Sequence, residues 1–302
     1  MGGVRCELYQ PTISVVIPAL NEARNIPHVF AKIPPDVYEI ILVDGGSVDN
    51  TIAVAKGLRP DVRIVTQTRC GKGNALACGF AAALGDIIAM VDADGSADPA
   101  EMPRFVDALL AGADFAKGTR FAPGGGSSDI TRLRRLGNKL LTVAFNIRYS
   151  RRYSDLCYGF NVFWRSHVHH LGLDATSPSP EAGDGRLWGD GFEIETLIHV
   201  RVAKASLAVT EVPSFEHSRI HGMSNLNALR DGMRVVRTIF ARGPGDLALG
   251  AAEADTSSST TLSNAGKFAV AAAAINVNAE RFVGDSCSHL IAEVSRSDRF
   301  SQ

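Results

Sequence analysis

The chain has 302 residues, of which 45% are hydrophobic and 21% are charged, which is ordinary for a globular protein with a sizeable core. Its 31 Lys and Arg nearly balance its 32 Asp and Glu, so the net charge of −1 excludes a highly charged disordered chain and a protein that coats nucleic acid. Because the five cysteines form no CxxC pair, we expect reduced thiols in a cytoplasmic protein: Cys6, Cys70, Cys78, Cys157 and Cys287. No signal peptide is recognised, and the late apolar stretch 268–275 is much shorter than the ~20 residues of a spanning helix.

The first part of the chain alternates predicted strands with predicted helices. The predicted strands are Ile13–Ile17, which Pro18 is expected to end, Glu39–Val43, Val62–Thr66, Asp86–Val91 and Asp114–Gly118. Helices are predicted near Ala23–Ile33, Asp49–Leu58, Asn74–Leu84 and Pro99–Ala111. Since the strands are almost wholly apolar, they predict an α/β protein with a mostly parallel central sheet that helices cover on both faces.

The composition changes after Arg120. A Gly/Ser/Pro linker is followed by a basic amphipathic stretch, two further predicted helices and one strand: 122–129, 133–153, 191–203, 227–241 and 207–212. These features predict four regions: an N-terminal lead (1–12), a first half of one domain (13–122), its second half (123–242) and an Ala/Ser-rich, weakly structured tail (243–302).

Polar residues follow three of the predicted strands directly. Asn21-Glu22 comes after the first strand and Pro18, Asp44 ends the second, and Asp92-Ala93-Asp94 ends the fourth. In an open parallel sheet, ligands bind beyond the carboxyl ends of the strands, so we expect these residues to converge on one site.

The pair Asp92 and Asp94 has two interpretations. Two carboxylates in this spacing can hold Mg²⁺ or Mn²⁺ and leave coordination positions for substrate phosphates. The residues that follow, Asp-Gly and Asp-Pro, are also typical of an ordinary turn. Gly71-Lys72-Gly73 before a helix could bring an ammonium and backbone N–H groups to phosphate, or could be a simple turn.

Taken together, the segments SVVIPALNE, ILVDGGSVDNT, GKGNAL, VDADGSADP and KGTRF resemble, in order and spacing, family 2 glycosyltransferases with the GT-A fold. The subgroup they resemble is that of the dolichol- or polyprenyl-phosphate sugar synthases, over about residues 13–242. One departure is Asp44-Gly45, where many members have Asp-Asp.

The resemblance implies roles for individual residues. Those implied to contact the nucleotide sugar are Pro18, Asn21, Glu22, Asp44, Lys72 and Asp92, of which Asp44 would contact the base. Asp92 and Asp94 are implied to hold the metal on the diphosphate, and Arg120 of KGTRF is implied to meet phosphate or acceptor. Glu22 could instead be an acid at a helix N-terminus, and Arg120 a solvated loop cation.

The second half carries the implied acceptor side. Asp155-Leu-Cys-Tyr-Gly-Phe resembles the Asp-x-x-x-Gly-Phe segment, and Arg219-Ile-His-Gly-Met-Ser resembles the RxxGxS loop that closes over phosphates. Asp155, Asp190 and Glu193 are candidates for a general base, although Asp190 and Glu193 could equally be helix caps. His217 or His221 could add a metal ligand, or both could be exposed loop residues.

The stretch 133–153 interleaves basic and apolar residues. Such a helix can lie on an anionic membrane surface, or it can pack on the domain with a solvated basic face.

The preferred hypothesis is an inverting, metal-dependent hexosyltransferase that takes a UDP- or GDP-sugar as donor and a polyprenyl phosphate as acceptor. We expect it in the cytoplasm or peripherally on the cytoplasmic membrane face, with no nucleic-acid partner. The alternatives are transfer to a glycan or small-molecule hydroxyl, a DxD Mg²⁺-dependent phosphatase, and a non-catalytic protein that binds nucleotide sugars.

Overall fold

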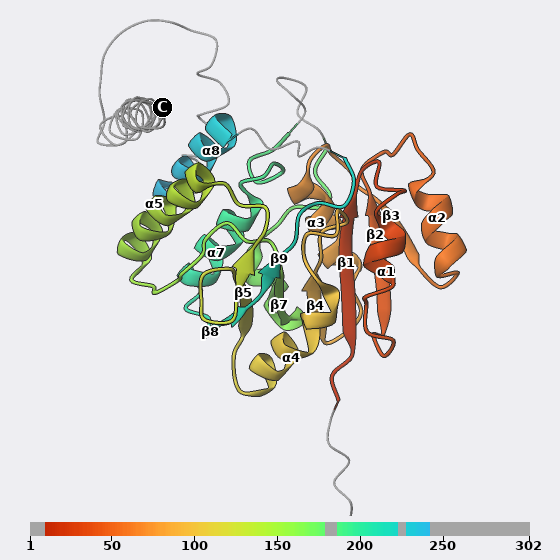
Figure 1. Ribbon diagram of the computed structural model, residues 1–302, viewed down its shortest axis with the longest axis horizontal. Helices are drawn as coiled ribbons and strands as arrows, with labels where there is room; N and C mark the ends of the chain where they lie inside the picture. Colours follow the sequence, from red (N-terminus) through yellow and green to blue (C-terminus); the bar gives the residue numbers. More distant parts are fainter. Residues whose placement is uncertain (1–9, 179–185, 223–227, 242–302) are drawn as a thin grey trace, which may run out of the picture. The chain divides into compact units, whose positions relative to one another are not determined.

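A computed structural model of the chain describes residues 10–178, 186–222 and 228–241. Its centre is a seven-stranded sheet in the order β3-β2-β1-β4-β7-β5-β8 (Figure 1). The strands are β1 (Ile13–Ala19), β2 (Glu39–Asp44), β3 (Arg63–Thr66), β4 (Ile87–Met90), β5 (Phe115–Thr119), β7 (Asn161–Trp164) and β8 (Val209–Pro213). A separate two-stranded ribbon pairs β6 (Gly126–Ser127) with β9 (Phe215–Glu216).

Helices cover both faces of the sheet, as the apolar strands predict (Figure 1). One face carries α1 (Ile26–Phe30), α2 (Thr51–Leu58) and α4 (Met102–Leu110), the last following a short 3₁₀ turn at Pro99–Glu101. The other carries α3 (Lys72–Ala82), α6 (Val168–Leu171), which follows a 3₁₀ turn at Arg165–His167, and α7 (Ile194–Lys204). In β1 the side chains alternate: Val15 and Ile17 enter the first core, and Val16 enters the second.

Two further helices, α5 (Arg132–Tyr149) and α8 (Ala228–Phe240), lie side by side and pack against α7 through a third apolar cluster (Figure 1). The side chain of Phe145 in α5 is fully buried there, with Ile239 of α8 and Val200 of α7. None of the helices in the described part of the chain combines the length and apolar composition needed to cross a bilayer.

The predicted first strand was wrong at its end, because β1 continues through Pro18 to Ala19. Proline is tolerated there because β1 pairs with β4 only up to Val16, so the missing N–H of Pro18 has no partner to lose on that side. The sequence analysis also missed β7, which inserts antiparallel between β4 and β5 and makes the sheet mixed. As expected, Cys70, Cys78 and Cys157 are free thiols. The predicted weakly structured tail at 243–302 lies outside the described residues.

Candidate active site

The site is built at the carboxyl ends of β1, β2 and β4. The order of the sheet places β1 between β2 and β4, with Ala19 opposite Asp44 in the parallel register. The loops that leave these three strands therefore share one edge of the sheet. The convergence inferred from the sequence rests on this topology.

The first two loops hold each other through backbone and side-chain hydrogen bonds. Asn21, which has a positive φ of 56°, accepts an N–H from Val48 at 2.8 Å and donates its own N–H to Ser47 Oγ at 2.9 Å. The Asp44 carboxylate is buried and accepts the N–H of Gly46 at 3.0 Å. Asp44 thus shapes its own loop, which leaves Asn21 exposed beside it and Pro18 half-buried below.

Asp92 lies directly after β4 and is paired with a lysine. Lys72, the first residue of α3, places its Nζ 2.7 Å from Asp92 Oδ1 and 2.6 Å from Glu195 Oε1, in the first turn of α7. Burial disfavours the charged form of Lys72, but the two carboxylates outweigh it and raise the pKa of Lys72 above its usual value. Burial likewise raises the pKa of Glu195, and Lys72 opposes that shift.

Asp94 is paired with an arginine from the other half of the chain. Arg219 contacts Asp94 Oδ2 through one terminal nitrogen and Glu22 Oε1 through the other, each at 3.0 Å. The backbone N–H of Ile220 donates to the Asp94 carbonyl at 3.3 Å. The segment 217–222 therefore lies across the Asp92–Asp94 turn, whereas Met223 and Ser224 of the RxxGxS motif fall outside the described residues.

The donor set suits a divalent cation that is shared with a diphosphate. In the described ranges no group of three or more His, Cys, Asp or Glu is placed to hold a metal ion, so this turn offers two carboxylates. Mg²⁺ is commonly bound in that way, with water and substrate phosphates completing its coordination. Gly159 keeps space beside them, because a Cβ at that position would approach Asp92 Oδ2 to 3.1 Å. The His217 ring packs on Phe215 instead, and that of His221 lies near His28.

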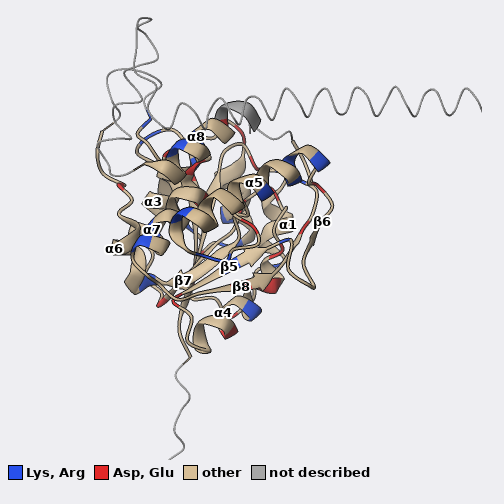
Figure 2. Cartoon of the chain, turned by 90° about the vertical axis from the view of Figure 1, so that its left-hand side faces the viewer, with Lys and Arg blue, Asp and Glu red and all other residues tan. Residues whose placement is uncertain are grey.

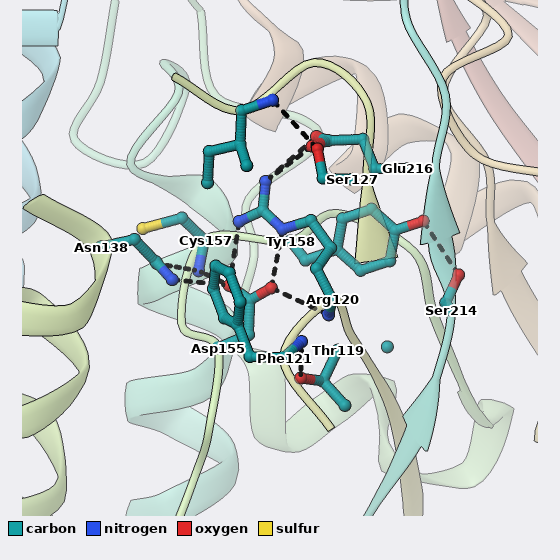
Figure 3. A network of polar contacts seen from close by, with 12 residues as sticks. Thr119, Arg120, Phe121, Ser127, Asn138, Asp155, Cys157, Tyr158, Ser214 and Glu216 are labelled. Atoms are coloured by element: carbon teal, nitrogen blue, oxygen red, sulfur yellow. Dashed lines mark hydrogen bonds and ion pairs between the residues drawn. The ribbon is translucent and has the colours of Figure 1, made fainter. Parts of the chain in front are cut away.

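Arg120 is enclosed between two carboxylates (Figure 3). Its Nε donates to Asp155 Oδ2 at 2.7 Å, and a terminal nitrogen donates to Glu216 Oε1 at 3.0 Å. Its side chain is 4% exposed, and it stacks over the ring of Tyr158. Burial would raise the pKa of Asp155, but Arg120 more than compensates and lowers that pKa below its usual range.

The other two candidate bases are also engaged. Asp190 is buried in an ion pair with Arg69, whose Nε lies 2.8 Å from its Oδ2. Glu193 is fully buried, and its Oε1 accepts the N–H of Gly189 at 3.0 Å. Its Oε2 lies 3.5 Å from Arg234 Nε of α8 and has no hydrogen-bond partner among the described residues.

Glu195 is not among the residues predicted for the site, although it stands only two positions after the candidate base Glu193. Residues two positions apart on a helix point to different faces, so Glu195 could have been considered for a different contact than Glu193. Its contact with Lys72 depends on the approach of α7 to α3, which local pattern cannot supply.

The strand-end carboxylates and their cations lie at the carboxyl edge of the sheet, which is where open α/β proteins bind their ligands. Residues 14–172 match the family model described as glycosyl transferase family 2. The chain belongs to this family, and its fold is the GT-A glycosyltransferase fold.

Relatives extend the similarity beyond the family model. The chain is 29% identical to glycosyltransferase AglJ of Haloferax volcanii over 236 residues, which cover 76% of this chain and 71% of that protein. It is 30% identical to polyprenol monophosphomannose synthase of Mycolicibacterium smegmatis over 249 residues, covering 78% and 89%. Among solved structures, glucosyl-3-phosphoglycerate synthase of Mycobacterium tuberculosis, in complex with Mn²⁺, UDP and phosphoglyceric acid, superposes with a TM-score of 0.56 at 26% identity, covering 76% and 77%. With some other relatives the similarity is confined to a shorter stretch: an uncharacterized glycosyltransferase of Mycobacterium bovis is 41% identical over 108 residues, which cover 36% of this chain and 48% of that protein.

Proposed function

We propose that the chain is an inverting, metal-dependent hexosyltransferase that moves a sugar from a UDP- or GDP-sugar to the phosphate of a polyprenyl lipid. The observation that carries the acceptor class is the engagement of Asp155, Asp190 and Glu193 in buried contacts with arginines. A hydroxyl acceptor needs a general base, whereas a phosphate oxygen is already anionic. Family membership favours sugar transfer over the phosphatase alternative.

The chain's own residues account for donor binding in this proposal. Pro18, Asn21, Glu22 and Asp44 line the nucleotide side at the ends of β1 and β2. Lys72 and Arg219 bring two fixed positive charges to the diphosphate side.

The transfer itself exchanges one bond for another. An acceptor phosphate oxygen forms a bond to the anomeric carbon while the bond from that carbon to the diphosphate oxygen breaks, with inversion of configuration. Asp92 and Asp94 would hold Mg²⁺ or Mn²⁺, which when bound stabilises the negative charge of the leaving diphosphate.

A second acceptor class deserves a place in the test. The structural neighbour named above was solved with phosphoglyceric acid, a small phosphorylated molecule that carries a hydroxyl. Transfer to the hydroxyl of such a molecule, or of a glycan, is the alternative for this chain.

The decisive experiment compares acceptors that differ in one group. UDP- and GDP-sugars are first screened by thermal shift with Mn²⁺ and with Mg²⁺, and the donor that stabilises the protein is carried forward. Polyprenyl phosphate, polyprenol without phosphate and 3-phosphoglycerate are then offered in parallel. We expect product only with polyprenyl phosphate. Product with 3-phosphoglycerate alone would replace this acceptor class, and the lack of stabilisation by any nucleotide sugar would contradict sugar transfer.

We also propose that the enzyme meets this lipid from the cytoplasmic face of the membrane through α5. Basic residues mark this helix in Figure 2, and the helix contains no acidic residue. Exposed apolar side chains follow one another at alternating spacings of three and four, which forms a stripe: Leu133, Leu136, Leu140, Val143 and Ile147. A stripe of this kind beside basic side chains suits an anionic bilayer surface.

Vesicle flotation tests this contact. We expect binding to vesicles with anionic lipid and little binding to neutral ones, and the double change Leu136→Gln with Leu140→Gln should weaken it. Leu110→Gln on α4, at a leucine that is also exposed, is the matched control. If the stripe instead pairs two copies of the chain, the protein should form a dimer in the absence of vesicles, and the double change should dissociate it.

A further inference from the structure

The two aspartates after β4 are held in the same way, each by a cation that has a second carboxylate. Lys72 bridges Asp92 and Glu195 at 2.7 and 2.6 Å. Arg219 bridges Asp94 and Glu22, both at 3.0 Å. Four carboxylates and two cations leave this cluster with a net charge of −2, which one divalent cation would neutralise.

Each cation occupies one oxygen of an aspartate that would hold the divalent cation. Lys72 Nζ contacts the Oδ1 atom of Asp92, whereas Gly159, which has no Cβ, leaves space beside the Oδ2 atom of the same carboxylate. An ammonium and a metal ion cannot both bind Asp92 Oδ1, since like charges in contact repel strongly. A divalent cation that takes Oδ1, or that binds Oδ2 beside the ammonium, therefore favours a Lys72 that gives up Asp92 while remaining in the site.

Glu195 offers Lys72 a place to remain. It stands in the first turn of α7, its side chain is largely buried, and its Oε1 is as close to the ammonium as Asp92 is. A Cβ at Gly159 would lie 3.5 Å from this Oε1 and 3.4 Å from Lys72 Nζ, so the pair sits against the backbone of the Asp-x-x-x-Gly-Phe segment. A carboxylate fixed in this way keeps the ammonium near the diphosphate without a second partner.

We propose that Lys72 occupies Asp92 until the divalent cation arrives, and that Glu195 is a positioning residue that then retains the Lys72 ammonium. The proposal rests on the proposed metal-dependent function and adds to it the order in which charges exchange at the site. Glu22 stands in the same relation to Arg219 on the other side of the turn.

The test measures Mn²⁺ binding directly, without turnover. Free Mn²⁺ is followed by electron paramagnetic resonance in titrations of the full chain, with and without UDP or GDP. Lys72→Met should tighten the binding of Mn²⁺ alone by severalfold, because the competing ammonium is gone, and should weaken the binding of the nucleotide to the Mn²⁺-loaded protein. Glu195→Gln should weaken Mn²⁺ binding about fivefold, because Lys72 then depends on Asp92 alone.

The double variant separates a positioning role from a direct one. In the Lys72→Met background, Glu195→Gln should change the Mn²⁺ affinity at least threefold less than it does in the presence of Lys72. Equal weakening in both backgrounds would make Glu195 a direct contributor to metal binding and would overturn this inference alone. If Lys72→Met weakens Mn²⁺ binding, the exchange is also overturned.

Controls keep these outcomes distinct. Asp36→Asn removes one negative charge from an exposed loop and should leave Mn²⁺ binding unchanged. If Glu195→Gln does not fold by circular dichroism, Glu195→Asp keeps the charge on a shorter arm and should give a smaller weakening in the same two backgrounds. Failure of the unaltered chain to bind Mn²⁺ even with UDP or GDP would contradict the metal-dependent function itself.

Discussion

Two regions of the molecule contain the same arrangement, a cation held between two carboxylates, in different surroundings; we call this arrangement the device below. Around Arg120 the arrangement is closed: Asp155 is fully buried, and the Arg120 side chain is 4% exposed (Figure 3). Around the Asp92–Asp94 turn the same device is open, with Lys72 at 17% and Arg219 at 26% exposure.

The surroundings decide what each device can do. A buried pair that loses one partner leaves a charge without solvent, so the Arg120 pairs resist exchange. A partly solvated pair can trade a partner for a metal ion or a phosphate, since water compensates the group that is released. We therefore expect a structural role for Arg120 and exchangeable contacts for Lys72 and Arg219.

Removing Arg120 breaks the closed device. Arg120→Met should lower the free energy of unfolding by about 3–5 kcal/mol, because Asp155 and Glu216 then lack their cation. Urea denaturation measures it. Arg59→Met is the control, because Arg59 forms a more exposed pair with Asp61 and its loss should cost less than about 1 kcal/mol. Unchanged stability with a raised acceptor KM would favour the phosphate contact that the family resemblance implies.

Neutralising the open device should act on turnover instead. Asp94→Asn is expected to lower kcat/KM with Mn²⁺ at least about 100-fold, equivalent to about 2.7 kcal/mol, while the free energy of unfolding changes little. Asp92→Asn should do the same. Asp98→Asn is the neighbouring control, since Asp98 caps the turn at Pro99 and pairs with Lys32. Near-normal turnover of Asp92→Asn or Asp94→Asn would refute the metal assignment.

A smaller change reduces the space beside the Asp92 carboxylate without removing a charge. Gly159→Ala would press a methyl group against the Asp92 carboxylate, so Mn²⁺ and nucleotide should bind about tenfold more weakly, which corresponds to about 1.4 kcal/mol. Isothermal titration calorimetry measures both affinities. Gly57→Ala in α2 is matched to it, because a Cβ there meets no atom within 4 Å. Equal affinities for the two variants would show that the space beside Asp92 is not used.

Much of the fold, and the edge of the sheet that carries the Asp92–Asp94 turn, could be predicted because their signals are local. Apolar strands that end in polar residues predict both the parallel sheet and the edge at which Asn21, Asp44 and Asp92 meet. The antiparallel β7 could not be predicted in this way, because a strand of four residues is too short for its sequence pattern to show which strands it pairs with.

The closed device lay beyond sequence reasoning for a different reason. Arg120, Asp155 and Glu216 are far apart in the sequence, and their pairing follows from the packing of β5 and β9 against the segment after α5. A motif identifies Arg120 as a cation after a strand, but whether such a cation is solvated or enclosed depends on tertiary contacts.

The buried His199 side chain adds a third case to the comparison, because it is an ionisable group without an ion-pair partner among the described residues. His199 of α7 is fully buried between the rings of Phe115 and Tyr153, and neither ring nitrogen has a hydrogen-bond partner among the described residues. Burial, with a contribution from Lys117, lowers the pKa of His199 well below 6.5.

This shift makes stability depend on pH in a defined direction. As the pH falls below 6.5, the unfolded chain takes up a proton at His199 before the folded chain does. The contribution of His199 to the free energy of unfolding is therefore full above pH 6.5 and falls by up to about 1.4 kcal/mol per pH unit below it. Urea denaturation at pH 7.5 and 5.5 should show this loss, and His199→Phe, which keeps a ring between Phe115 and Tyr153, should reduce it. An identical loss in His199→Phe would mean that other groups carry the acid sensitivity. A reduced loss would establish that an enclosed ionisable group without a partner is held neutral, whereas the enclosed Arg120 stays charged because two carboxylates surround it.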